Sequence, residues 1–355
     1  MIYYCIAAIA PLLGWAGYEW MKGNYKLAGK KEAKIKWIIL LLSILPMFLM
    51  FVLRHKSVGS DTPGYVLGFE KGILKYSFYE LLTKYDGDNE IGYMLYVKLI
   101  SLVTDNYTVF FLINAIIIFG AMLHFSIVYT KNPFLFFYLF ITMGTYSFIS
   151  TGLRQSLAIA ICLLAVDFVR DKKLISFLFM VCLAYFFHKS ALIFLLIYPL
   201  SLIKKYNWIG FIYIFLAVIF IVGFSAFHTA FIQLLGYDGY DIEETGNAYL
   251  VVLWIVLLAG YSFYILGGAK KEKLEQIIMA HFAALTVVFW LLRLISRTAE
   301  RISFYFICGL YAYFSHAGLY NKDKLSTLIK WLLILGSFVL LVYRYTNVEY
   351  LFFWQ

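Results

Sequence analysis

The sequence FISTGLRQ, residues 148–155, joins two strongly apolar segments and places Arg154 at their junction. A later junction, FHKS at residues 187–190, has the same character, with His188 and Lys189 between apolar runs. A charged side chain at the centre of a bilayer costs about 2.5 kcal/mol or more, so such residues persist where they face a water-filled cavity or bind a charged group. These junctions predict a membrane protein whose polar chemistry lies at the ends of its spans.

The composition of the chain is that of an integral membrane protein. Its 355 residues are 63% hydrophobic and 14% charged, whereas a soluble domain has roughly 45–50% apolar and about 25% charged residues. With spans of about 20 residues and short loops, this length predicts an all-α polytopic protein of about twelve transmembrane helices. Residues 1–355 would form one integral membrane domain. The net charge of +10 comes from Lys and Arg in loops, which the positive-inside rule explains without a nucleic-acid partner.

The lysines indicate the orientation of the spans. The richest basic segment, residues 21–36, is expected to be a cytoplasmic loop, which places the N-terminus outside. Residues 54–106 then form an outer loop, in which residues 91–103 are too short to span and predict an interfacial or re-entrant helix. Residues 228–247 form a second outer loop. The expected spans are residues 2–20, 37–53, 107–129, 133–149, 152–169, 174–187, 190–203, 208–227, 248–267, 277–295, 302–320 and 327–345.

The arginines at the outer ends of the spans predict an anion site. A guanidinium stays charged at any relevant pH and matches phosphate oxygens with two parallel hydrogen bonds. For Arg154 the alternative is an interfacial arginine that reaches lipid headgroups. Arg293, Arg297 and Arg301 share one face if a single helix carries them, and like charges at that spacing repel unless an anion lies between them. The alternative for these three is a helix end that is merely rich in arginine.

His188 and Asp61 are the candidate bases. A histidine titrates near neutrality, which suits a group that takes a proton from a sugar hydroxyl, although a lone histidine at a span end is often structural. Asp61 lies in the turn-forming loop GSDTPGY at residues 59–65, where it is a base, a ligand for sugar hydroxyls or an N-cap. The tyrosines of this outer segment suit sugar faces, but an interfacial aromatic belt predicts them equally. The spacing of the histidines predicts no catalytic metal.

Five short motifs follow one another along the chain. They are Gly59-Ser60-Asp61-Thr62-Pro63-Gly64-Tyr65, Glu90-x-Gly92-Tyr93, Arg154-Gln155-x-x-Ala158, Phe187-His188-Lys189-Ser190-Ala191 and Arg301-x-x-x-Tyr305-Phe306. In this order they resemble the EpsG family, which are bacterial polysaccharide polymerases of the Wzy type. Each motif is short, so their common order carries the likeness.

The resemblance implies a glycosyltransferase of the bacterial cytoplasmic membrane, with a multi-span fold similar to the GT-C class. The donor would be a glycan on undecaprenyl pyrophosphate, and the acceptor would be the terminal sugar of a second lipid-linked repeat unit on the outer face. Catalytic roles would fall to Arg154 and to His188 or Asp61, without a cofactor. Substrate binding would fall to Arg293, Arg297, Arg301, Gln155, Lys189, Tyr65, Glu90, Tyr93 and Tyr305. A chain-length regulator and a flippase of the same pathway are the expected protein partners.

Two other functions remain open on the sequence. A flippase for lipid-linked oligosaccharides would use outer arginines for the same pyrophosphate, but it needs ionisable residues deep in the bilayer. Mid-span positions here hold almost none, apart from Asp167 near an inner end. A membrane O-acyltransferase of surface glycans should show a charged constellation at a cytoplasmic entry for its acyl donor, and the sequence shows none there.

Overall fold

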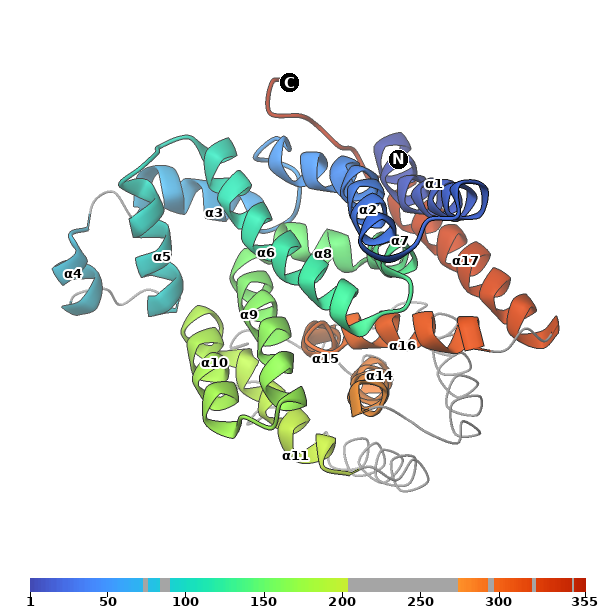
Figure 1. Cartoon of the computed structure of the whole chain (residues 1–355). Coiled ribbons are helices and arrows are strands. Elements are labelled where there is room, and N and C mark those ends of the chain that lie inside the picture. Colours follow the sequence, from blue (N-terminus) through green and yellow to red (C-terminus); the bar gives the residue numbers. More distant parts are fainter. Residues whose placement is uncertain (73–75, 84–89, 204–273, 293–296, 321–323, 347) are drawn as a thin grey trace. The chain divides into compact units, whose positions relative to one another are not determined.

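The computed structural model describes residues 1–72, 76–83, 90–203, 274–292, 297–320, 324–346 and 348–355 (Figure 1). Within these ranges the chain is helical and contains no β-strand, which confirms the expected all-α class. The helices form two compact units, one of residues 1–123, 132–156 and 331–355 and the other of residues 124–131 and 157–330. The expected spans at residues 208–227 and 248–267, and the outer loop at residues 228–247, lie outside the described residues.

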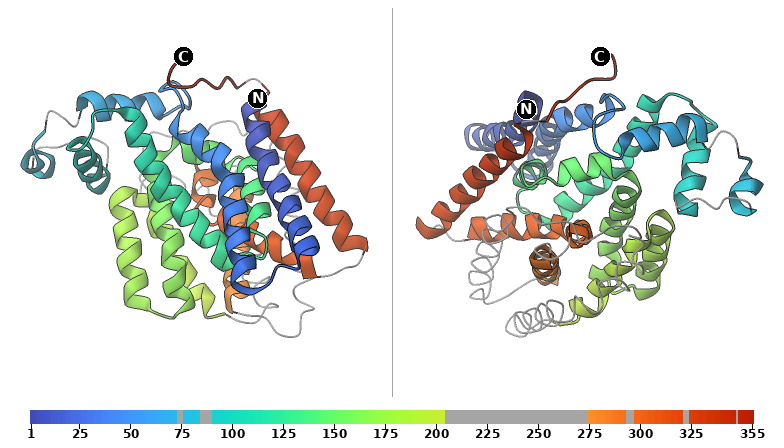
Figure 2. Two further views of the ribbon diagram at one scale, coloured as in Figure 1. Left: turned by 45° about the horizontal axis from the view of Figure 1, so that its top comes forward. Right: turned by 180° about the vertical axis from the view of Figure 1, so that it is seen from behind.

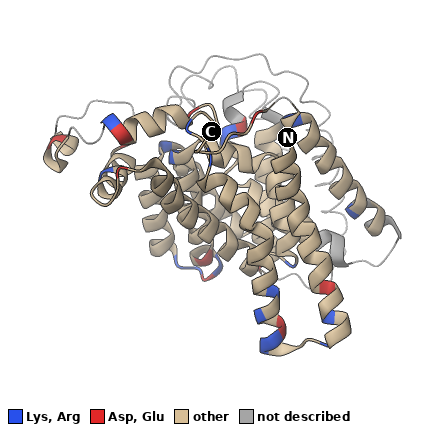
Figure 3. Ribbon diagram, turned by 90° about the horizontal axis from the view of Figure 1, so that it is seen from above, with Lys and Arg blue, Asp and Glu red and all other residues tan. Residues whose placement is uncertain are grey.

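The first unit begins with a helical hairpin of α1 (Ile2–Tyr25) and α2 (Gly29–Val52), and α1 also packs against α7 (Pro133–Thr142). The basic segment at residues 21–36 is therefore not the expected loop but the facing ends of two helices. Lysine favours helix, and Glu32 accepts bonds from Lys22 Nζ and the Tyr18 hydroxyl, each at 2.7 Å. Figure 3 shows the charges of this hairpin gathered at its turn, away from the N-terminus.

The two ends of the chain pack on each other in the same unit (Figure 2). The ring of Tyr3 lies 5.1 Å from the ring of Phe352. The C-terminal segment also pairs with the residues that follow α2, since the His55 N–H donates to the Leu351 carbonyl at 2.9 Å. The C-terminal segment thus contacts residues at both ends of the α1–α2 hairpin.

A break divides the expected span at residues 133–149 into α7 and α8 (Thr145–Thr151), which meet at a bend of 69°. The bend falls at Gly144, whose φ of +88° favours glycine. A Cβ there would lie 0.8 Å from Arg344 Nη1, and that nitrogen donates to the Met143 carbonyl at 3.0 Å. Arg344 thus satisfies a carbonyl at the break, as backbone within a membrane requires. The expectation of one helix was wrong here because a glycine and a distant arginine act together.

Short helices fill the segment between α2 and α6 (Tyr107–Tyr129). They are α3 (Thr62–Leu67), a π-helical turn (Gly68–Gly72), α4 (Phe78–Thr83) and α5 (Ile91–Ser101). The 11 residues of α5 rise about 16 Å, roughly half the thickness of the hydrocarbon core. This length is that of a helix that does not cross the membrane.

The second unit is built mainly from the helices that follow α9 (Leu153–Arg170). They are α10 (Leu174–Phe187), a 3₁₀-helix (Lys189–Leu196), α11 (Ile197–Ser201), α14 (Leu274–Leu292), α15 (Arg297–Ser303) and α16 (Ile307–Tyr320), and α17 (Lys324–Tyr345) then leads back to the first unit. α14 and α16 cross closely, because a Cβ on Gly309 would lie 2.2 Å from Phe282. The ring of Phe306 stacks on Phe289 at 5.8 Å and on Phe194 at 6.0 Å.

Two helices among the described residues, α2 and α6, are long and apolar enough to cross a membrane, and the bent pair of α7 and α8 makes three if it forms one span. Shorter apolar helices, including α10 and the 3₁₀-helix with α11, accompany them. The protein is therefore a helical membrane protein, and the total of about twelve spans stays a prediction.

Candidate functional site

Arg154 lies in the first turn of α9, which is separated by one residue from the end of α8 at Thr151. The Gly152 N–H bonds back to the Phe148 carbonyl at 2.8 Å, and the Ser156 N–H bonds to the Gly152 carbonyl at 2.9 Å. One helix therefore stops and the next begins around a single glycine. The N-terminus of a helix carries partial positive charge, so a cation there is unfavourable unless an anion lies beside it. Gln155, the next residue, is buried.

Glu90 supplies that anion. Its Oε2 lies 2.7 Å from Arg154 Nη1, and the two side chains are 8% and 25% exposed respectively. Glu90 occupies the N-cap position of α5, but its carboxylate makes no capping hydrogen bond. Arg154 also donates a hydrogen bond to the Tyr65 hydroxyl, and the ring of Tyr93 lies 5.8 Å from that of Tyr65. The first unit thus brings three of the motifs together.

Asp61 lies at the start of α3 in a loop that packs against α8. Gly59 has a φ of +103°, and a Cβ there would lie 2.5 Å from Thr151 Cγ2, so this loop requires glycine. Asp61 stands at the N-cap position of α3 without a side-chain capping bond, and its Oδ1 accepts from Ser60 Oγ at 2.9 Å. The carboxylate of Asp61 therefore does not perform the capping role that the sequence left open. The Gly59 contact places it in the loop beside the helix end that leads into Arg154.

The second unit joins the other two motifs. Ser190 Oγ lies 3.0 Å from the Tyr305 hydroxyl, and both side chains are fully buried. His188, at the junction of α10 and the 3₁₀-helix, is 7% exposed, whereas Lys189 is exposed. Tyr305, which the sequence assigned to substrate, is buried here and links the two motifs through its hydroxyl.

Arg293, Arg297 and Arg301 do not lie on one described helix, which the expectation of a shared face required. α14 ends at Leu292 and α15 begins at Arg297. Arg301 lies in the last turn of α15 and is partly exposed. Arg293 lies outside the described residues. The argument from one shared helical face therefore applies to Arg297 and Arg301, which α15 spaces four residues apart.

The sequence of residues 37–355 matches the EpsG family, and this range includes all five motifs. The chain belongs to the EpsG family. Members of that family are similar to Wzy-type polysaccharide polymerases, so this EpsG protein is a polysaccharide-polymerase-like membrane protein. No curated protein and no solved structure matches the chain.

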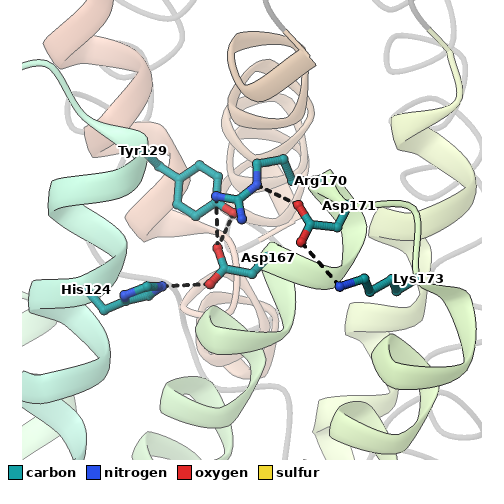
Figure 4. Close-up of polar contacts among 6 residues, drawn as sticks. All are labelled: His124, Tyr129, Asp167, Arg170, Asp171 and Lys173. Carbon is teal, nitrogen blue, oxygen red and sulfur yellow. Dashed lines mark hydrogen bonds and ion pairs between the residues drawn. The ribbon is translucent and has the colours of Figure 1, made fainter.

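The EpsG protein also holds a polar cluster that the sequence did not predict (Figure 4). Asp167 lies 2.7 Å from His124 Nε2, accepts from the Tyr129 hydroxyl at 2.6 Å and lies 3.4 Å from Arg170 Nη1. Arg170 Nε in turn donates to Asp171 at 2.9 Å. These residues come from the C-terminal parts of α6 and α9. The expected spans 107–129 and 152–169 both run inward, and that common direction could have indicated that His124 and Asp167 lie at a similar depth.

Proposed function

We propose that this EpsG protein is a glycosyltransferase that polymerises undecaprenyl-pyrophosphate-linked oligosaccharide repeat units. The reaction takes place on the outer face of the bacterial cytoplasmic membrane. A hydroxyl of the terminal sugar on one lipid-linked unit attacks the first sugar of a lipid-linked glycan. The bond between that sugar and its phosphate breaks, and undecaprenyl pyrophosphate leaves.

The single observation that carries the proposal is the Arg154–Glu90 pair at the start of α9, in a chain of the EpsG family. A helix N-terminus and a guanidinium both favour phosphate oxygens. Negative charge builds on the pyrophosphate as it departs, and one donor aimed at such charge is worth about 10²–10³ in rate. Arg154, held in a defined position and partly exposed, has the chemistry for that role.

The remaining motif residues are proposed to bind the substrates. They are Arg293, Arg297 and Arg301 for the pyrophosphate, and Lys189 and Tyr65 for the glycan. The buried Gln155, Tyr93 and Tyr305 would act indirectly, by supporting their neighbours Arg154, Tyr65 and Ser190. The acceptor hydroxyl also needs a base, and the motifs offer His188 and Asp61. The proposal uses no metal or cofactor. A chain-length regulator and a flippase of the same pathway are the proposed protein partners.

The test is polymerisation by purified protein in lipid nanodiscs. A defined undecaprenyl-pyrophosphate-linked repeat unit is supplied without nucleotide sugar and with a metal chelator. A ladder of longer lipid-linked products, accompanied by release of undecaprenyl pyrophosphate, is the expected result. Arg154→Ala serves as the inactive control. A wild-type protein that makes no ladder from a competent repeat unit would contradict the proposal.

The flippase is the second candidate, because arginines that bind a pyrophosphate serve transport as well as transfer. The two functions are distinguished by reconstituting the protein in liposomes with the same lipid-linked unit. Movement of the unit across the bilayer without a ladder would favour the flippase. Acyl transfer to the glycan, with neither ladder nor movement, would favour the membrane O-acyltransferase.

A further inference from the structure

Glu90 pairs with Arg154, the guanidinium that the proposed function assigns to the donor pyrophosphate. The Glu90 Oε2 to Arg154 Nη1 distance is 2.7 Å, and the Glu90 side chain is 8% exposed. A guanidinium binds carboxylate and phosphate through the same planar fork of donors. A pyrophosphate that uses Arg154 as its ligand therefore competes with Glu90.

If a pyrophosphate bound Arg154, the Glu90 carboxylate would lose its cationic partner and become a stronger base. A nearly buried carboxylate is stabilised as an anion by a cation beside it, and it takes a proton more readily once that cation is engaged elsewhere. The N-cap position does not hold the carboxylate, because Glu90 makes no capping bond to α5. Tyr65 is partly exposed and packs edge to face on the buried Tyr93 at 5.8 Å, so Tyr65 supplies aromatic surface for a sugar next to the carboxylate.

We propose that Glu90 is the catalytic base of the transfer, held by Arg154 in the resting protein and released when the donor pyrophosphate binds that arginine. This inference rests on the proposed function and places Glu90 in the role offered above to His188 or Asp61. The acceptor O–H bond breaks, and its proton passes to the Glu90 carboxylate. The acceptor oxygen bonds to C1 of the donor sugar. The C1–O bond to phosphate breaks, its electron pair stays on undecaprenyl pyrophosphate, and the proton later passes to solvent.

Among the residues that the structure describes, titratable groups close to the Glu90 carboxylate include Arg154 on α9, Tyr65 on α3 and Tyr93 on α5, with Asp61 beside Tyr65. Burial raises the pKa of Tyr65, and it raises the pKa of Tyr93 well above its ordinary value. Both phenols therefore stay neutral between about pH 5 and pH 9, where an enzyme base is titrated. A rate that falls on the acidic side of this range reports the base.

The experiment compares single-turnover polymerisation of the undecaprenyl-pyrophosphate-linked unit across this pH range in full-length wild type, Glu90→Gln, His188→Gln and Asp61→Asn. Glu90→Gln should slow transfer by about 10²–10⁴-fold and abolish the acidic fall in rate. It should bind undecaprenyl pyrophosphate at least as tightly as wild type, because a neutral amide competes less for Arg154. Added formate should restore part of the rate of Glu90→Ala.

Glu80→Gln is the matched control. Glu80 lies on α4 in the same outer segment, where its carboxylate accepts from the Ser77 N–H at 2.9 Å, and its variant should polymerise within about twofold of wild type. A wild-type protein without a ladder refutes the proposed function itself. If the ladder forms and Glu90→Gln keeps the wild-type rate, or slows with the acidic fall intact, the inference is wrong. Loss of the acidic fall in His188→Gln or Asp61→Asn instead would assign the base to that residue.

Discussion

Arg54 and Arg154 both lie at the ends of apolar helices in the first unit, yet their surroundings differ. Arg54 is 1% exposed, and its guanidinium carbon lies 4.2 Å and 3.9 Å from the ring centres of Phe51 and Phe111. Its Nη1 donates to the Phe51 carbonyl, while its Nε and Nη2 have no hydrogen-bond partner among the described residues. Arg154 instead meets a carboxylate and a phenol, and a quarter of its side chain is exposed.

Under the proposed function, an arginine that binds substrate differs from a structural one in having a partner that can be exchanged, and charge alone does not separate the two. A desolvated cation–π contact is worth about 2 kcal/mol or more, and no anion is needed to hold Arg54 in place. Its backbone pairs with Phe352, and the Tyr350 hydroxyl bonds to the Met50 carbonyl, so the C-terminal segment covers it. Arg154 instead has an anionic partner, Glu90, which the proposed mechanism replaces with the donor pyrophosphate.

The largest effect is expected when both arginines are changed to methionine. Arg154→Met should lower the initial rate of ladder formation by about 10²–10³-fold, because the departing pyrophosphate loses its charged donor. Arg54→Met should keep the rate within about threefold, because its side chain only packs. Equal losses of rate in both variants would mean that Arg54 also takes part in the reaction and is not a purely structural arginine.

For the free energy of unfolding we expect the opposite order, with a larger loss from changing Arg54 than from changing Arg154. Arg54→Ala opens a cavity between two phenylalanine rings, and large-to-small changes of this kind cost about 2–5 kcal/mol. Arg54→Met should recover most of that loss, because replacing an unpaired buried charge with an apolar side chain of similar length is often neutral. Thermal unfolding in detergent, followed by tryptophan fluorescence, measures both. If Arg54→Met unfolds as readily as Arg54→Ala, the charge itself holds the aromatic rings together.

The sequence predicted the helix bounds that local patterns determine, but it did not predict the contacts between residues far apart in the chain. The bounds of α6 and α10 agree with the expected spans at residues 107–129 and 174–187, because each is a mainly apolar run without Lys, Arg, Asp or Glu that polar residues flank. The break at Gly144 could not be foreseen, since Arg344 lies 201 residues beyond the carbonyl that it satisfies. The sequence named Arg154 and Glu90 separately, but their pairing joins residues 64 positions apart. Nothing in the local pattern distinguished Arg54 from Arg154.

A smaller effect is expected from the segment that covers Arg54. Tyr350→Phe removes the hydroxyl that donates to the Met50 carbonyl and should cost about 1 kcal/mol of unfolding free energy. The control is Tyr343→Phe, since Tyr343 is 81% exposed, and it should leave the unfolding temperature unchanged. Polymerisation should be unaffected in both. A loss of polymerisation in Tyr350→Phe without a loss of stability would show that the C-terminal segment positions the reaction rather than only the fold.

The smallest effect is expected at Asp167, whose carboxylate, like that of Glu90, has a cationic arginine nearby. Asp167 is 26% exposed and shares its charge among His124, Tyr129 and Arg170, so Asp167→Asn should cost about 1 kcal/mol or less. Ladder formation should stay within about twofold of wild type, in contrast to Glu90→Gln. Liposome transport of the lipid-linked unit is the second measurement. A flippase needs ionisable groups along the path of the headgroup, so an Asp167→Asn variant that stops transport would favour that function over polymerisation.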